Sequence, residues 1–183
     1  MHSHFLYSIL CPLLKGSIII IHHLEMTPLI QTNWQLFVKE KLGNFNHMES
    51  WILEDTSLIG RLTEKHGSIR LELISEKICL HCDQQISSQE ISGNLRKIFL
   101  KANSNIVYAE SFFSEGVINQ FKKFGALGNE ALGKYLFSHK NINKVETYVA
   151  LYQLKNKEYI ARKCIYSLNE ELFSVIEVFL FDE

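Results

Sequence analysis

The strongest pattern in the chain is the apolar run from Leu172 to Phe181, which carries one carboxylate, Glu177, near its middle. The β-branched and aromatic residues of this run predict a strand in a sheet covered on both faces, or the last strand of a closed cup. An unpaired carboxylate buried there would cost several kcal/mol. Glu177 should therefore have a cationic or hydrogen-bonding partner, or be protonated. A frayed strand end or a structural ion pair would explain it equally well.

Shorter apolar runs predict the other strands. They cover residues 68–75, 77–83, 95–101, 106–113, 144–153 and 159–167. The first two would form a hairpin that turns at Glu76-Lys77, and the next two would pair across the turn at 103–105. Antiparallel neighbours are the simplest arrangement for strands that follow one another so closely along the chain.

Helical patterns occupy the beginning and the middle of the chain. They cover residues 28–42, 57–64, 117–124 and 131–138. Ser57 is placed to cap the second of these helices. Because strands mostly follow strands, the pattern predicts an α+β fold with a single, mainly antiparallel sheet. The helical insertion between residues 113 and 144 is placed to cover one face of that sheet.

Length and composition favour one globular domain. The chain has 183 residues, of which 46% are hydrophobic and 21% charged, enough for one good core. Residues 1–25 are interpreted as an N-terminal extension and residues 26–183 as the domain. The extension is mostly apolar but is interrupted by Pro12, Lys15 and Gly16, so no stable membrane insertion is expected.

The charge bears on the kind of binding partner, and the cysteines bear on the redox compartment and on metal binding. The net charge of −1 provides no overall basic field for nucleic acid, so none is expected as a partner. Four cysteines are few for a disulfide scaffold and favour a reducing compartment. The Cys79 and Cys82 pair has C-x-x-C spacing, but a zinc site needs about four ligands and no second pair exists. The basic pair Arg162-Lys163 is interpreted as solvated.

Five segments resemble the chorismate pyruvate-lyase family and follow the order found there. They are WILEDTSLIGRL at 51–62, LRKIFL at 95–100, LGNEALGKYLF at 127–137, ARK at 161–163 and IEVFL at 176–180. Each segment alone is weakly specific, whereas five in order form a fairly specific signal. The richness in Ile, Lys, Asn and Phe fits a plastid-encoded relative, so a soluble protein of the plastid stroma or cytoplasm is expected.

The resemblance implies a fold in which two helical lid segments enclose a buried ligand pocket. It places Arg96 at the ring carboxylate of the ligand and Glu177 at the para-oxygen end. The backbone N–H groups of Leu58 and Leu132, one in each lid, would bind the same carboxylate as Arg96. The segment 129–131 replaces a more typical basic and Pro-containing lid, and Glu130 within it is unhelpful beside an anion unless it points outward.

The implied reaction expels pyruvate from chorismate and leaves 4-hydroxybenzoate for prenylquinone synthesis. The ring carboxylate suits the planar guanidinium of Arg96. Aromatisation supplies the driving force, so no metal, flavin or nucleotide cofactor is expected. Glu177 would either carry a proton for part of the cycle, favoured by its apolar strand, or only orient the ligand. The alternative function is a non-catalytic domain of the same fold that binds a small aromatic acid. The oligomeric state is left open.

Overall fold

A computed structural model describes residues 27–28, 33–39, 42–154 and 156–181. Within these residues the chain forms one eight-stranded sheet in the order β1-β6-β7-β8-β5-β4-β3, with β2 also paired to β6. Every pair is antiparallel. The strands are β1 (Thr27–Pro28), β2 (Gln35–Leu36), β3 (Arg70–His81), β4 (Ile91–Lys101), β5 (Asn105–Ser114), β6 (Ile142–Leu154), β7 (Lys157–Leu168) and β8 (Glu171–Phe179). The predicted α+β fold with an antiparallel sheet is therefore confirmed.

The C-terminal strand β8 lies in the centre of the sheet, between β7 and β5. Its hydrogen bonds are satisfied on both edges, and its residues Phe173, Val178 and Phe179 are at most 1% exposed. A strand in this position is covered on both faces, which explains its nearly continuous apolar sequence. Of the two predicted settings for this strand, the covered sheet is the one observed.

The predicted hairpin at Glu76-Lys77 is wrong. Residues 70–81 form one continuous strand, β3, and both halves pair with β4. The register shifts between Leu73 and Ser75, where Ile74 is the extra residue of a bulge. A bulge moves the side chains that follow it to the other face, and this break in the alternation resembled a turn in the sequence.

The predicted helix at 28–42 is also wrong in its described part. Gln35 and Leu36 form strand β2 and pair with Val149 and Tyr148 of β6. Pairing with the edge of β6 satisfies backbone groups that a helix would have satisfied internally. The predicted N-terminal extension, residues 1–25, lies outside the described residues.

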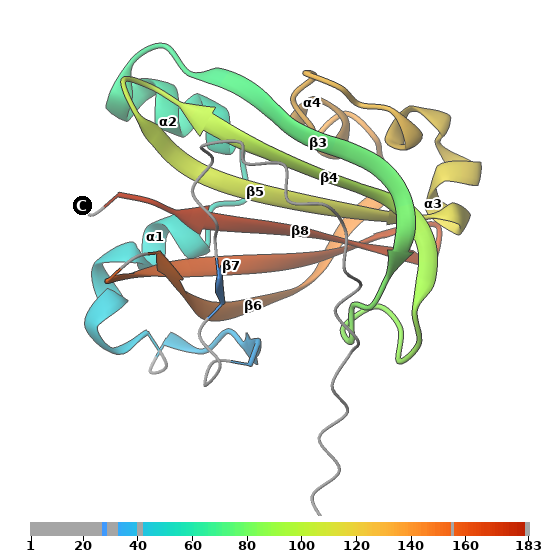
Figure 1. Cartoon of the computed structure of the whole chain (residues 1–183), viewed down its shortest axis with the longest axis horizontal. Helices are drawn as coiled ribbons and strands as arrows, with labels where there is room; N and C mark the ends of the chain where they lie inside the picture. Colours follow the sequence, from blue (N-terminus) through green and yellow to red (C-terminus); the bar gives the residue numbers. More distant parts are fainter. Residues whose placement is uncertain (1–26, 29–32, 40–41, 155, 182–183) are drawn as a thin grey trace, which may run out of the picture.

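The helices form two groups (Figure 1). The first group precedes β3, and the second connects β5 to β6. They are the 3₁₀ helix η2 (Gly43–Met48), α1 (Glu49–Ile52) and α2 (Leu58–His66), then α3 (Glu115–Gln120), the 3₁₀ helix η3 (Lys122–Gly125) and α4 (Gly133–Leu136). Ser57 caps α2 by accepting a hydrogen bond from the Gly60 N–H at 3.2 Å, as predicted. None of the helices in the described part of the chain is long and apolar enough to cross a membrane.

Each group of helices packs on the same face of the sheet, at opposite ends. Trp51, Ile52 and Leu62 of the first group pack with side chains of β4, β5 and β8 around Val107. Val117 and Phe124 of the second group belong to a separate core cluster with buried residues of β5 and β8. This face therefore has an apolar cluster at each end and a gap between them.

The opposite face carries a third apolar cluster and a buried ion pair. The cluster is built on Phe99, Tyr108 and Val178. The pair joins Lys163 Nζ to Asp83 at 2.5 Å, with both residues at most 4% exposed. Burial lowers the pKa of Lys163, and the Asp83 carboxylate opposes that effect. The prediction that Arg162-Lys163 is solvated is wrong, because β7 is buried on both faces and so buries both adjacent side chains.

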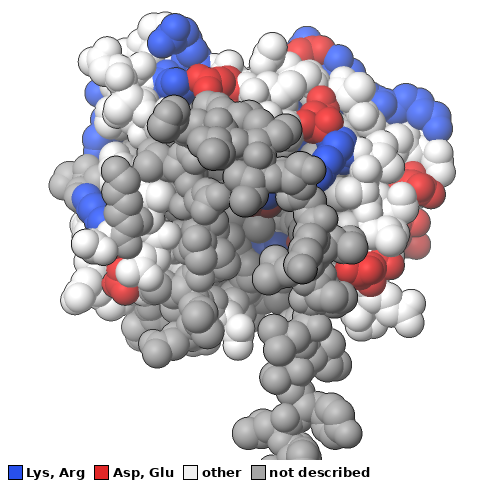
Figure 2. Space-filling view, in the orientation of Figure 1, with Lys and Arg blue, Asp and Glu red and all other residues white. Residues whose placement is uncertain are grey.

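Basic and acidic side chains are interspersed on the face shown in Figure 2. Among the described residues visible there, we see no extended area of a single sign. This distribution agrees with the nearly balanced composition, whose net charge is −1.

We predict that Asp83→Asn destabilises the fold by about 3 kcal/mol, because it leaves the Lys163 ammonium buried without its counter-charge. The free energy of unfolding in urea measures the effect. The control is Asp55→Asn, since Asp55 pairs with Lys144 at the surface and is 71% exposed; it should cost less than about 1 kcal/mol. Equal losses in the two variants would contradict a special cost for the buried charge.

Candidate functional site

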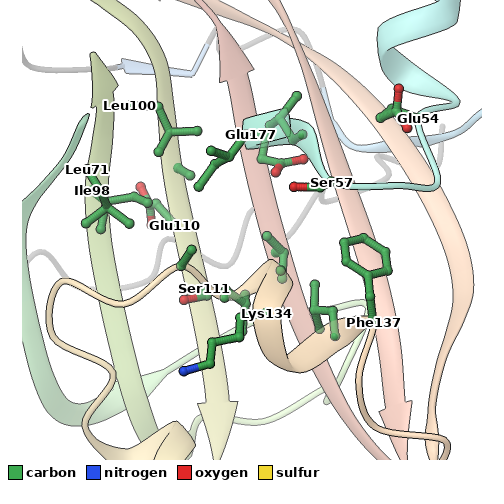
Figure 3. A pocket seen from close by; sticks show the side chains of 18 of the residues that line it. Glu54, Ser57, Leu71, Ile98, Leu100, Glu110, Ser111, Lys134, Phe137 and Glu177 are labelled. Carbon is green, nitrogen blue, oxygen red and sulfur yellow. The ribbon is translucent and has the colours of Figure 1, made fainter. Parts of the chain in front are cut away.

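A cavity of about 300 Å³ occupies the gap between the two groups of helices. Its floor is formed by two rows of residues paired across β4, β5, β8 and β7. One row is Ile98, Ala109, Glu177 and Arg162, and the other begins with Arg96, Ser111 and Val175. The helical segments complete the wall (Figure 3). The polar side chains on this face of the sheet thus lie in the gap between the two apolar clusters.

All four residues predicted for the site line this cavity. Arg96 and Glu177 come from the sheet, whereas Leu58 and Leu132 come from the helical segments. Arg96 is two strands and two residues away from Glu177 in the sheet, which separates their Cα atoms by roughly 12 Å. The two side chains therefore approach the cavity from different sides.

Arg96 is a buried cation held by neutral groups. It is 2% exposed, and its Nε and Nη2 donate to the Gly128 carbonyl at 3.0 and 2.9 Å. Nη2 also donates to the Glu130 carbonyl at 2.8 Å, while Nη1 has no partner among the described residues. Burial lowers the pKa of Arg96, and the charge of Glu76, which lies opposite Arg96 on β3, opposes this effect. The N–H groups of Nη1, at one edge of the guanidinium, thus remain available to an anion.

Glu76 fixes the turn that Arg96 contacts. Its carboxylate accepts hydrogen bonds from the backbone N–H groups of Leu127 and Gly128, both at 2.8 Å, and from the Asn94 amide at 2.9 Å. Burial would raise the pKa of Glu76, but these hydrogen bonds and the Arg96 charge hold it below its ordinary value. The turn at Gly128 is therefore held by two side chains. Glu76 accepts from the N–H groups of the turn, and Arg96 donates to its carbonyl groups.

Glu177 forms an ion pair with Arg162. The Glu177 carboxylate accepts from Arg162 Nε at 2.5 Å, with 14% of its side chain exposed. Arg162 Nη1 also donates to the carbonyls of Trp51, at 2.8 Å, and Glu54, at 2.9 Å. Burial opposes the charged form of Arg162, but the Glu177 carboxylate raises the pKa of Arg162. The guanidinium therefore anchors the carboxylate and ties the end of α1 to the sheet.

The backbone N–H groups of Leu58 and Leu132 are unused within the described part of the chain. Leu58 is the first residue of α2, and Leu132 immediately precedes α4. The first N–H groups of a helix have no partner inside it. Both residues line the cavity.

Glu130 does not line the cavity. Its carboxylate forms ion pairs with Lys123 and Lys134 and accepts from the Tyr135 hydroxyl. The hydrogen bonds from Lys123 and Tyr135 lower the pKa of Glu130 to about 2. Only its backbone carbonyl faces Arg96. The unfavourable charge expected from the sequence is therefore neutralised at the surface.

Sequence reasoning missed Arg162, Glu76 and Ser111. The sequence pattern leaves Arg162 solvated, although it stands inside an apolar strand, and a charge in such a strand must find a partner. The same pattern places Glu76 in a turn because of the bulge at Ile74. Ser111 gives no signal in the sequence, since a single serine within a strand is ordinary.

No cluster of three or more His, Cys, Asp or Glu side chains suited to a metal ion occurs among the described residues. Cys79 and Cys82 are free thiols, half-buried and exposed respectively.

Comparison with known proteins gives a consistent family. A family model described as chorismate lyase matches residues 32–183. A probable chorismate pyruvate-lyase of Pasteurella multocida (strain Pm70) is 24% identical over 138 residues, covering 73% of this chain and 80% of the relative. A probable chorismate pyruvate-lyase of Pseudoalteromonas translucida (strain TAC 125) is 24% identical over 149 residues, covering 72% of this chain and 83% of the relative.

We predict that Glu76→Gln lowers the free energy of unfolding by about 1 kcal/mol or more at neutral pH, because charge-assisted hydrogen bonds to the turn become neutral ones. The folded state depresses the pKa of Glu76, so its contribution is fully present above the ordinary value of 4.5 and is lost as the pH falls through the folded value. The difference between wild type and variant should shrink accordingly in urea unfolding at decreasing pH.

The control for this series is Glu158→Gln, because Glu158 is exposed on β7. It should show little difference from wild type at any pH. A Glu76→Gln effect that stays constant below pH 4.5 would contradict the role assigned to the charge.

Proposed function

Because this chain belongs to the chorismate lyase family, we propose that it cleaves chorismate to 4-hydroxybenzoate and pyruvate. The observation that carries the proposal is the buried guanidinium of Arg96, which forms no salt bridge among the described residues, in the cavity that also contains Glu177. A buried cation without a salt bridge is costly, and an anionic ligand would repay that cost. The cavity thus offers one end for a carboxylate and another for an oxygen substituent.

The ring carboxylate would lie against Arg96 Nη1. The N–H groups of Leu58 and Leu132 would donate to the same carboxylate, one from each helical segment. These segments would act as lids, because a ligand bonded to both holds them together over the sheet. Water would then be excluded from the ring, which strengthens the electrostatic interactions inside.

Glu177 would act at the opposite end of the ring. Cleavage breaks the bond between the ring and the ether oxygen, removes a proton from the neighbouring ring carbon and returns a proton to the methylene carbon of the released enolpyruvate. The elements of the substrate are thereby divided between the two products, with no water consumed. Arg162 fixes the position of the Glu177 carboxylate, so this group could transfer a proton without first having to reorient.

Aromatisation of the ring provides the driving force, and we propose that the chain needs no cofactor for this step. Its work would be to bind, desolvate and orient chorismate and to help one proton move.

The direct experiment mixes the purified protein with chorismate and measures both products, pyruvate by a coupled assay and 4-hydroxybenzoate by chromatography. Equal amounts of both are expected. Arg96→Ala should lower the affinity for 4-hydroxybenzoate by about 10-fold or more, since a charge-assisted bond is lost. Arg96→Lys tests the same point with the charge retained, because lysine cannot reproduce the planar fork.

If the protein binds 4-hydroxybenzoate but does not convert chorismate, it is a binding domain of the same fold and not an enzyme. Unchanged affinity in both Arg96 variants would refute the carboxylate assignment.

We predict that Glu177→Gln lowers kcat by about 100-fold or more if Glu177 transfers a proton, which is the ordinary size of general acid–base catalysis. The amide keeps the shape and an acceptor oxygen but cannot carry the proton. The measurement is steady-state turnover of chorismate, with the affinity for 4-hydroxybenzoate as a test of an intact cavity. Turnover close to that of wild type would leave Glu177 only an orienting role.

A further inference from the structure

Ser111 is a buried polar residue whose hydroxyl has no partner. It lies on β5 and is 4% exposed, and its Oγ forms no hydrogen bond within the described part of the chain. A buried hydroxyl without a partner costs about 1–3 kcal/mol. Such a cost is expected where the missing partner is a ligand.

The position of Ser111 distinguishes it from the other residues that have a buried side-chain polar atom without a partner. In the described residues these atoms are His66 Nε2 and Asn94 Oδ1. Neither His66 nor Asn94 lines the cavity, whereas Ser111 does (Figure 3). The unused hydroxyl therefore belongs to the floor of the candidate site.

The register of the sheet places Ser111 beside Arg96. Ser111 is directly opposite Arg96 on β4 and Val175 on β8, and Cβ atoms of such pairs are about 5 Å apart. Glu177 is instead opposite Ala109, two residues further along β5. Ser111 thus shares a row with the buried guanidinium, and Glu177 lies in the next row.

We propose that the Ser111 hydroxyl donates a hydrogen bond to the ring carboxylate of the ligand, next to Arg96. This inference rests on the proposed function, which supplies the carboxylate. An ionised carboxylate only accepts hydrogen bonds, and a serine hydroxyl is free to rotate and donate. The helical segments supply donors from above through Leu58 and Leu132, and Ser111 supplies one from the sheet. The carboxylate is then recognised from the floor as well as from the lids.

The test compares wild type, Ser111→Ala and Ser174→Ala by calorimetric titration with 4-hydroxybenzoate and with benzoate. Ser174 is the matched control, because it is a buried serine of the neighbouring strand β8 that does not line the cavity. Ser111→Ala should weaken both ligands by about 10-fold or more, since both carry the carboxylate and the lost bond is charge-assisted. Its melting temperature should not fall, because the alanine removes an unsatisfied group.

Several results would overturn the proposal. Affinities of Ser111→Ala within about 2-fold of wild type would show that Ser111 does not form the proposed hydrogen bond. A loss for 4-hydroxybenzoate alone would move it to the phenol oxygen, and an equal loss in Ser174→Ala would show general loosening. If wild type converts chorismate but Ser111→Ala binds both ligands as tightly as wild type, this inference is wrong and the proposed function stands. Failure of wild type to bind either ligand would sink the proposed function together with it.

Discussion

The burial of one guanidinium, that of Arg96, organises the cavity and the turn at Gly128 beside it. Arg96 extends from the sheet to the turn at Gly128, where it donates to backbone carbonyls, and Glu76 holds the N–H groups of the same turn. The polypeptide before α4 is therefore attached to the sheet through polar contacts around Arg96. A ligand that bonds to Arg96 would share this network, and its binding would then depend on the position of the turn at Gly128.

The two cavity arginines differ in how their charges are compensated. Glu177 forms a salt bridge with Arg162 within the protein, whereas Arg96 donates only to carbonyl groups and has the Glu76 charge opposite it on β3 without a salt bridge. An anion gains more beside Arg96, because no carboxylate in the described part of the chain is hydrogen-bonded to that guanidinium. This asymmetry would orient a ligand that has a carboxylate at one end and a hydroxyl at the other.

The sequence patterns predicted the α+β class, most long strands and the helix capped by Ser57, because alternation and capping are local signals. They failed at β3, where a bulge at Ile74 imitated a turn, and at β2, where pairing with β6 outweighs the helical pattern. The grouping of Arg96, Glu177, Leu58 and Leu132 came from the resemblance alone. Local pattern could not find it, since it depends on which distant strands become neighbours.

The residues that only the structure revealed share one property. Arg162, Glu76 and Ser111 are polar side chains whose surroundings are set by the register of the sheet, and a shift of one residue would send each to the other face. The bulge at Ile74 thus has a structural consequence: β3 keeps its pairing with β4 at both ends while Glu76 reaches the turn at Gly128. A strand without the extra residue would direct that carboxylate away from the turn, and Arg96 would lose the opposing negative charge.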